Sequence, residues 1–237
     1  MAIRVFETDP EAAPKPRQFA DDLVGRFRSG YQINGRPAAL TEWRVTTGDP
    51  EVADEVRSLL GGDKPQPWDT KGEDNLEVFT EAGSVEIIIE RPKSLRSEMV
   101  LWGRNGAIRR CDGISQHGEG DEGKACECPQ SFADRKDAAR SGKGCQPSIT
   151  LFFKLREAPD LGVFKFTSGS WSLVRDLGPV EAKLAEIDGP AYATLRLEQV
   201  EWEVKETGAK RSFTKPVIEV TGAVPAASRD EDDEPPF

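Results

Sequence analysis

Alternating apolar and polar residues predict most of the secondary structure of this chain. The alternation predicts strands over residues 38–45 and 193–205, and a shorter strand over residues 216–220. Three further segments each predict a pair of strands: residues 76–90 with a turn at Ala82-Gly83, residues 97–113, and residues 149–166. Within residues 97–113, Asn105-Gly106 offers two residues that tolerate positive φ, which predicts a two-residue type I′ hairpin turn.

Helical spacing of apolar residues is confined to a few segments. Residues 18–28 predict a short helix, followed by a turn-rich connection over residues 30–37. The clearest helix begins after Asp49, with Pro50 at its first position, and ends at Gly61-Gly62. Residues 171–187 predict a third helix with a break near Gly178-Pro179.

These elements predict an α+β fold that is mainly antiparallel β, with a few helices. An OB-like arrangement of the strands is one form that it could take. We expect one domain over residues 1–222, with a Cys-rich insertion at residues 111–145. We expect residues 223–237 to be a disordered acidic tail, because they are short of apolar residues and rich in charge.

Composition narrows the classes of partner. The 237 residues are 37% hydrophobic and 31% charged, which is typical of a soluble globular protein. No apolar run approaches the roughly 20 residues that cross a bilayer, and the beginning of the chain has no secretory signal. We therefore expect a cytoplasmic protein with no membrane partner. The net charge is −10, and −6 without residues 229–234, which favours a protein partner over duplex DNA.

The four cysteines all lie in one segment that is nearly devoid of large apolar residues. They are Cys111, Cys126, Cys128 and Cys145. A segment that cannot bury apolar surface needs another cross-link, and four thiolates around one zinc ion would supply it. His117, the only histidine, lies in the same segment and could replace one thiol. The alternative is a mobile loop with unliganded thiols. The predicted zinc is structural, since four protein ligands leave no position for a substrate.

Motifs of enzyme chemistry are not found. The chain lacks a phosphate-binding loop, a nucleophile elbow, an HExxH helix and a GxGxxG turn. The single histidine leaves little scope for imidazole acid–base catalysis. We expect a protein that is not an enzyme and has no catalytic residues.

Two groups of basic and aromatic residues suggest contact with single-stranded DNA. Basic side chains interleaved with aromatic rings on a β-surface can pair with phosphates and stack on bases. The alternative is ordinary solvated strand faces, with Trp102 pointing inward. The candidate residues are Arg91, Lys93, Arg96, Trp102, Arg104, Arg109 and Arg110 in the first group, and Lys205, Lys210, Arg211, Phe213 and Lys215 in the second.

Several stretches resemble a known family. They include MAIRVFETDP, ADDLVGRFRSGYQINGRPAALTEWRVTTGDP, SEMVLWGRNG, KACECP and FKLREAPDLGVFKFTSGSW. These resemble the recombination directionality factors of Streptomyces phages that carry large serine integrases. The resemblance covers nearly all of the chain up to about residue 222. It implies a binding protein in the bacterial host cell that contacts the phage integrase on att DNA. The family switches that integrase from attP × attB integration to attL × attR excision.

The end of the chain, DEDDEPPF, resembles the acidic tip of bacterial single-stranded DNA-binding proteins. This resemblance implies a peptide that recruits host replication or repair proteins, with a terminal ring for an apolar pocket and carboxylates for a basic rim. The alternative is a solubilising end. A rival function follows: a phage single-stranded DNA-binding or replication accessory protein. The residues of this candidate site are Asp230, Glu231, Asp232, Asp233, Glu234, Pro235, Pro236 and Phe237.

Overall fold

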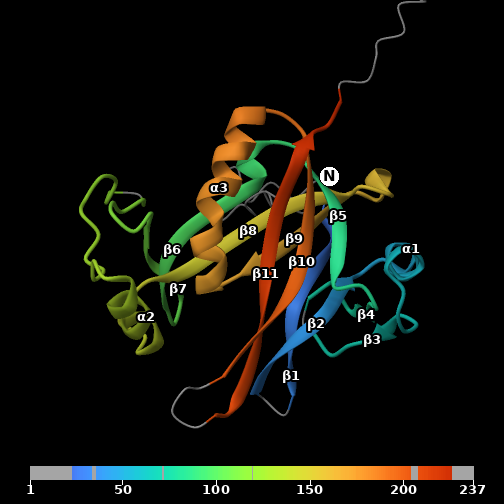
Figure 1. Cartoon of the computed structure of the whole chain (residues 1–237), viewed down its shortest axis with the longest axis horizontal. Coiled ribbons are helices and arrows are strands. Elements are labelled where there is room, and N and C mark those ends of the chain that lie inside the picture. The colour runs from blue at the N-terminus through green and yellow to red at the C-terminus, as the bar shows by residue number, and fades with distance from the viewer. Residues whose placement is uncertain (1–22, 34–35, 71, 119, 204–207, 226–237) are drawn as a thin grey trace, which may run out of the picture.

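The computed structural model describes residues 23–33, 36–70, 72–118, 120–203 and 208–225 (Figure 1). Within these ranges the chain is α+β and mainly antiparallel β, as predicted. The strands are β1 (Leu23–Ile33), β2 (Arg36–Thr47), β3 (Gln66–Pro67), β4 (Leu76–Phe79), β5 (Ser84–Ile89), β6 (Leu95–Gly103), β7 (Gly106–Cys111), β8 (Gln146–Leu155), β9 (Val163–Ser168), β10 (Ala191–Glu203) and β11 (Lys210–Ala223). The helices are α1 (Pro50–Leu60), α2 (Phe132–Arg140) and α3 (Trp171–Ile187), with 3-10 turns at Pro92–Ser94 and Pro159–Leu161. None of the described helices is long and apolar enough to cross a membrane.

The strands form one continuous sheet in the order β11-β10-β5-β8-β9-β1-β2-β4-β3, with the β6–β7 hairpin attached to β8. β8 is central because its first half pairs with β6 and its last two residues pair with β5. Among the described strands, β1 and β9 form the one parallel pair. This path is open at β11 and at β3, whereas an OB-fold is a five-stranded barrel. The structure therefore keeps the predicted class with a different strand order.

Strand β1 corrects a sequence prediction. Residues 18–28 read as a helix, but Leu23–Ile33 is a strand paired with both β2 and β9, and residues 18–22 lie outside the described ranges. Alternation explains the outcome: Phe27 is 2% exposed and lies in the core, while Arg26 and Arg28 lie on the opposite face. The predicted turn-rich connection is correspondingly shorter, since β1 and β2 together take up most of residues 30–37.

Helix α1 forms as predicted. The side chain of Asp49 accepts a hydrogen bond from the Glu51 N–H at 2.8 Å, and Pro50 occupies the first turn. The helix ends before Gly61 and Gly62, both at positive φ. A Cβ at Gly62 would lie 2.0 Å from the carbonyl oxygen of Phe79, so only glycine fits there.

Helix α3 has the predicted bounds but no break. Pro179 lies inside it, where it removes one backbone hydrogen bond. Leu173, Leu177 and Leu184 are buried against the sheet on both sides of the proline. Packing of this apolar face therefore holds one continuous helix across a local breaker.

The β6–β7 hairpin forms as predicted, but its turn is different. Gly103 pairs with Gly106, so Arg104 and Asn105 are the two turn residues. Gly106 has φ 130°, and Asn105 is not at positive φ, which excludes the predicted type I′ turn. An irregularity in pairing after Leu101 shifts the register by one residue, so Ile108 is left outside the ladder.

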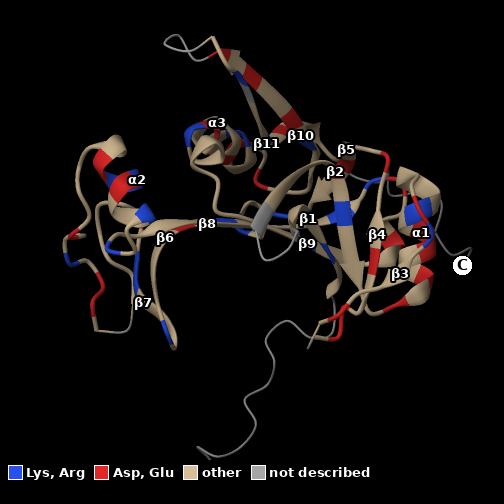
Figure 2. Cartoon of the chain, turned by 90° about the horizontal axis from the view of Figure 1, so that it is seen from below, with Lys and Arg blue, Asp and Glu red and all other residues tan. Residues whose placement is uncertain are grey.

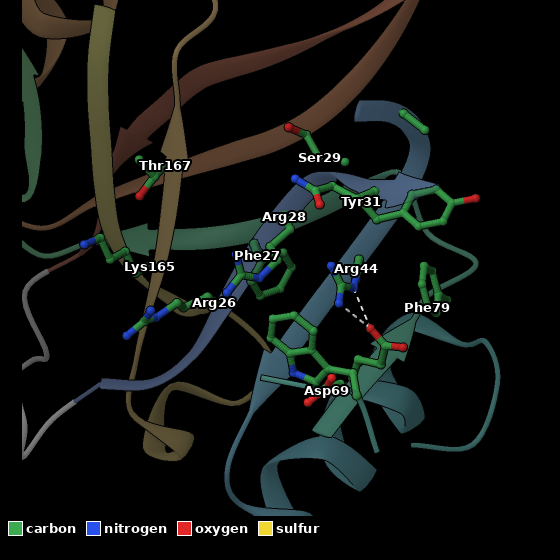
Figure 3. Close-up of a pocket in the computed structure, with 15 residues that line it drawn as sticks. Arg26, Phe27, Arg28, Ser29, Tyr31, Arg44, Asp69, Phe79, Lys165 and Thr167 are labelled. Atoms are coloured by element: carbon green, nitrogen blue, oxygen red, sulfur yellow. Dashed lines mark hydrogen bonds and ion pairs between the residues drawn. The ribbon is translucent and has the colours of Figure 1, made fainter. Parts of the chain in front are cut away.

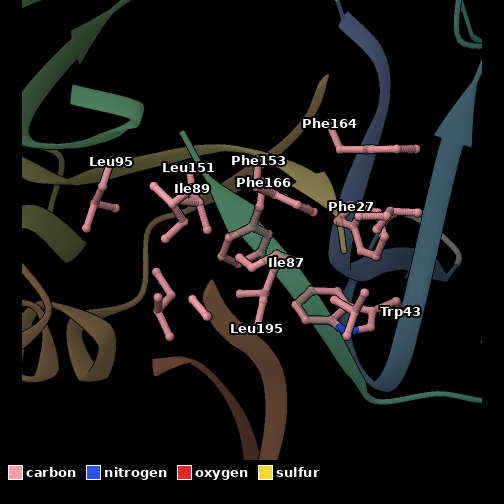
Figure 4. Packing of buried hydrophobic residues seen from close by; sticks show 14 of the residues in the cluster. Phe27, Trp43, Ile87, Ile89, Leu95, Leu151, Phe153, Phe164, Phe166 and Leu195 are labelled. Atoms are coloured by element: carbon pink, nitrogen blue, oxygen red, sulfur yellow. The ribbon is translucent and has the colours of Figure 1, made fainter. Parts of the chain in front are cut away.

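The core lies between two parts of this curved sheet (Figure 4). Phe27 of β1 makes edge-on contacts with Trp43, Phe153 and Phe164, at ring-centroid distances of 5.6, 5.2 and 5.5 Å. β10 and β11 fold over β2, and α3 covers β11. One face of the β8-β9-β1-β2 portion is thereby buried, and its other face carries partly exposed polar residues such as Arg26 and Lys165.

Candidate metal centre and binding surfaces

Four cysteines from separate parts of the chain converge on one point. Cys111 ends β7, and Cys145 stands immediately before β8. Both strands pair with β6, which brings these two cysteines together at one end of the sheet. Cys126 and Cys128 come from the loop between them. All four Sγ atoms lie within 4.8 Å of one another.

This spacing suits a tetrahedral metal ion. Four sulfur atoms, each about 2.3 Å from one metal, lie about 3.8 Å apart. The Sγ atoms of Cys126 and Cys111 are 3.2 Å apart, and the Cys128 N–H donates to the Cys126 Sγ at 3.4 Å. The four cysteines can hold a metal ion with every coordination position supplied by the protein.

The thiols need a cation in order to ionise together. Burial raises the pKa of Cys126 to about 11, and burial with the neighbouring thiols raises the pKa of Cys145 further. Burial also opposes ionisation of Cys128, yet hydrogen bonds from the backbone N–H and side chain of Cys145 lower its pKa. A bound divalent ion would stabilise all four thiolates, and its binding would release protons.

Residues 111–145, here called the Cys lobe, have almost no apolar interior. The small hydrophobic cluster at the lobe consists of Cys111, Cys145 and Met99 of the neighbouring strand β6. Helix α2 buries none of its residues. Arg135 fastens α2 by donating from Nη2 to the Gly113 carbonyl at 2.6 Å. Figures 1 and 2 place β6, β7 and α2 at one end of the molecule, away from α1. The lobe therefore depends on its cysteine cluster rather than on the main core.

His117, the alternative ligand, lies outside the group of four sulfur atoms. Its Nε2 is 3.8 Å from Oδ2 of Asp112, and its side chain is 53% exposed. The cysteines form a complete set of four without it.

The residues of the first predicted basic group do not form one continuous surface. Arg109 pairs with Glu127 at 2.8 Å beside the cysteines, and Arg110 pairs with Glu98. Arg96 lies over the ring of Phe152 at 5.3 Å, on another part of the sheet. The remaining members, Arg91, Lys93, Arg104 and Trp102, are exposed, and Trp102 is 47% exposed rather than inward.

The second predicted group lies on β11, which is much longer than the predicted strand. Lys215 is flanked by Asp176 at 3.8 Å and Glu198 at 3.5 Å, so its charge is largely balanced. Lys210 is exposed near the strand's beginning. Lys205 and the side chain of Arg211 lie outside the described parts. Phe213 contacts Trp202 of β10 edge to face, with ring centroids 5.6 Å apart.

Residues 198–203 and 210–215, here called the arm, form a two-stranded extension of the sheet. Within the described residues, β5 pairs with β10 as far as Arg196, and beyond it the arm strands pair only with one another. In both Figures 1 and 2 the arm projects from the body. Trp202 and Phe213 are 43% and 42% exposed, and alternation from the buried Leu195 and Ile218 places them on the solvent face.

A groove on the outer face of β1, β2 and β9 holds residues that the sequence reading missed (Figure 3). It has a volume of about 980 Å³, and Arg26, Arg28, Arg44, Trp68 and Lys165 are among its lining residues. The available signal was the alternation in LVGRFRSGY, which places Arg26 and Arg28 on one face of a strand. A helix places residues two apart on different faces, so the helix predicted for residues 18–28 separates Arg26 from Arg28.

Comparison with models of protein families identifies the family of this chain. A family model named Gp3-like, described as recombination directionality factor-like, matches residues 24–221. The chain belongs to this family. No solved structure matches this directionality-factor-like chain.

The part of the chain that matches the family includes the metal centre and both binding surfaces described above. The Cys lobe, the arm and the groove all lie within residues 24–221. The acidic tip Asp230–Phe237 lies beyond the match and outside the described residues.

Proposed function

We propose that this protein is a directionality factor that binds a phage-encoded large serine integrase on att DNA. By that binding it switches the integrase from attP × attB integration to attL × attR excision, without catalysing a reaction itself. The observation that carries this proposal is the family match over residues 24–221. The net charge of −10 supports a protein as the main partner, because a protein that coats duplex DNA needs a positive surface.

Such a switch is a shift of population. The factor stabilises the excision-competent arrangement only by the amount by which it binds that arrangement more tightly. Moving a recombinase from about 1:99 to about 99:1 requires roughly a 10⁴-fold difference in affinity. The factor therefore needs a surface whose contacts with the integrase form in one arrangement and not in the other.

The arm is our proposed contact with the recombinase. An isolated two-stranded ribbon is marginally stable in water, so a long one with two exposed rings is suited to being covered by a partner. Aromatic side chains are also enriched among the residues that dominate protein–protein binding energy. Trp202 and Phe213 touch one another, which fixes both rings before a partner arrives.

Zinc is our proposed ion for the cysteine cluster. Four thiolates in a closed tetrahedral set are the ligands of structural zinc sites. Arg109, which lies beside the cluster, would offset part of the negative charge of a zinc–tetrathiolate centre. The ion would hold the Cys lobe against β6 and β7 and would take no part in chemistry.

Direct binding tests the partner. The purified protein is expected to form a stable complex with the large serine integrase encoded in the same genome, measured by size-exclusion chromatography with light scattering. We assign the acidic tip to a host replication or repair partner, so Phe237→Ala should bind the integrase as the wild type does. Failure of the wild-type protein to bind the integrase, either free or on att DNA, would contradict the proposed partner.

A further inference from the structure

Five basic side chains form a continuous strip across the outer face of the sheet. Arg26 pairs in register with Lys165 of β9, and Arg28 pairs in register with Arg44 of β2. Arg96 of β6 extends the strip, because Arg96 and Lys165 both lie over the ring of Phe152, at 5.3 and 5.7 Å. The strip crosses five neighbouring strands, from β6 to β2, which span about 19 Å at about 4.8 Å per strand. The basic strip, as named here, consists of Arg26, Arg28, Arg44, Arg96 and Lys165.

The positive charge of the basic strip is only partly balanced. Arg26 pairs with Asp74 at 3.0 Å, and Arg44 pairs with Glu77. Among the described residues, Arg28 and Lys165 have no carboxylate within ion-pair distance. Arg28 donates instead to the Thr46 hydroxyl at 3.0 Å.

These cations repel one another. Burial, followed by the charges of Arg44 and Arg26, lowers the pKa of Arg28. Burial, followed by the charges of Arg26 and Arg96, lowers the pKa of Lys165. A bound anion would relieve this repulsion, and the repulsion is unusual in a protein whose net charge is −10.

Aromatic rings lie among these cations. The Trp68 ring lies 4.5 Å from the Arg44 guanidinium and 5.5 Å from that of Arg28. The indole N–H of Trp68 donates to the Asp74 carbonyl, which fixes the ring in place. Tyr31 and Phe79 contact one another edge to face at 5.8 Å on the same groove wall. Figure 3 shows Arg26 and Arg28 on β1 and Lys165 on the neighbouring strand, all three among the residues that line this groove.

We propose that the basic strip and its groove bind the phosphodiester backbone of single-stranded nucleic acid. Cations that follow a groove, with aromatic side chains between them, are the arrangement that pairs with phosphates and stacks on bases. Tyr31 and Trp68 line this groove together with the cations, so the unstacked bases of a single strand have rings to stack on, whereas the bases of a duplex are already stacked in pairs. This activity is separate from integrase binding, because the basic strip lies on different strands from the arm.

Fluorescence anisotropy with labelled DNA tests this site in the full-length protein. The probes are an oligo-dT of about 15 nucleotides, within the range of single-strand binding sites, a duplex of the same length, and a peptide of sequence DEDDEPPF. The variant Arg28→Gln/Lys165→Gln removes the two cations that lack carboxylate partners. Its matched control, Arg91→Gln/Lys93→Gln, changes the charge equally at exposed positions outside the strip. A second variant, Thr167→Glu, adds a carboxylate at an exposed position of the groove, where folding is least affected.

We expect the oligo-dT to bind more tightly than the duplex. The groove double variant should weaken oligo-dT binding at least tenfold and lower the salt slope by about 1.4, at about 0.7 for each phosphate that is no longer neutralised. Thr167→Glu should weaken it similarly, and the control should stay within about twofold. No binding of oligo-dT at low salt would overturn the proposal. Equal binding of the duplex, equal weakening in the control, or binding of the peptide alone would also overturn it.

Discussion

Cys128→Ser is expected to abolish metal binding and to unfold the Cys lobe while the main core stays folded. The lobe buries almost no apolar side chains, so we expect its order to depend on a metal ion held by the four cysteines. Structural zinc contributes about 10–16 kcal/mol in small zinc-finger peptides, far more than this lobe's packing could supply. Elemental analysis should fall from about one ion per chain to well below half. Hydrogen exchange should become fast in residues 112–144 and stay slow in β1, β2 and β9.

Two companion variants make this result specific. Cys126→Ser should behave like Cys128→Ser, because both residues belong to the four-sulfur group. His117→Ala should keep its metal and its protection, because His117 lies outside that group. A wild-type protein that is free of metal after mild purification, and yet protected throughout the Cys lobe, would refute the metal centre. Loss of the ion in His117→Ala would mean that the ligand set is wrong.

Trp202→Ala/Phe213→Ala is expected to reduce integrase binding, and with it excision, by at least about 30-fold, which corresponds to the loss of about 2 kcal/mol that defines a single binding hot spot. The two rings lie on the solvent face of the arm, so their removal should leave the core intact. Circular dichroism and thermal unfolding should therefore match the wild type within about 0.5 kcal/mol, as is usual for surface substitutions. The measurement is a titration of attL × attR recombination against factor concentration.

Trp102→Ala is the matched control for the arm variant. Trp102 is exposed to a similar extent, at 47%, but lies on the β6–β7 hairpin. Excision should be unchanged when Trp102 is replaced. If Trp102→Ala abolishes excision and the arm variant does not, the integrase contact lies on the hairpin instead.

Local patterns predicted the elements whose sequence and packing agree. The cap at Asp49 and the glycine end at Gly61 mark α1 in both sequence and structure. The alternation in β8 and in β10 is equally clear, since each buries every second residue near the core. The clustering of cysteines in the sequence also led to the group of four sulfur atoms, because a segment with no apolar core has few other ways to be held.

Properties that depend on distant partners were not predictable. The segment 23–28 is short, and the spacing of its apolar residues fits both a helix and a strand. The pairing of β1 with β2 and β9 makes it a strand. The Pro179 break fails to appear because α3 is held on the sheet at both ends. The basic strip draws its residues from β6, β9, β1 and β2, so no window of the sequence contains it. Only the order of the strands in the sheet brings these residues together.

The two proposals place integrase binding and single-strand binding on different surfaces of one molecule. We propose the arm as the contact with a protein partner, and the groove on the outer face as the site for an anionic strand. The acidic tip DEDDEPPF lies outside both surfaces in sequence, which is consistent with a third and independent partner. Trp202→Ala/Phe213→Ala changes only the arm, Arg28→Gln/Lys165→Gln only the groove and Phe237→Ala only the tip, so the three roles can be tested one at a time.

The central proposal is a reversal of direction, and recombination by the serine integrase of the same genome measures it most directly. Purified integrase is incubated with attL and attR, and separately with attP and attB, each with and without this protein. With the protein present, attL × attR recombination should appear and attP × attB recombination should fall. If integrase that is active on attP × attB shows no change in either reaction, the protein is not the directionality factor of that integrase.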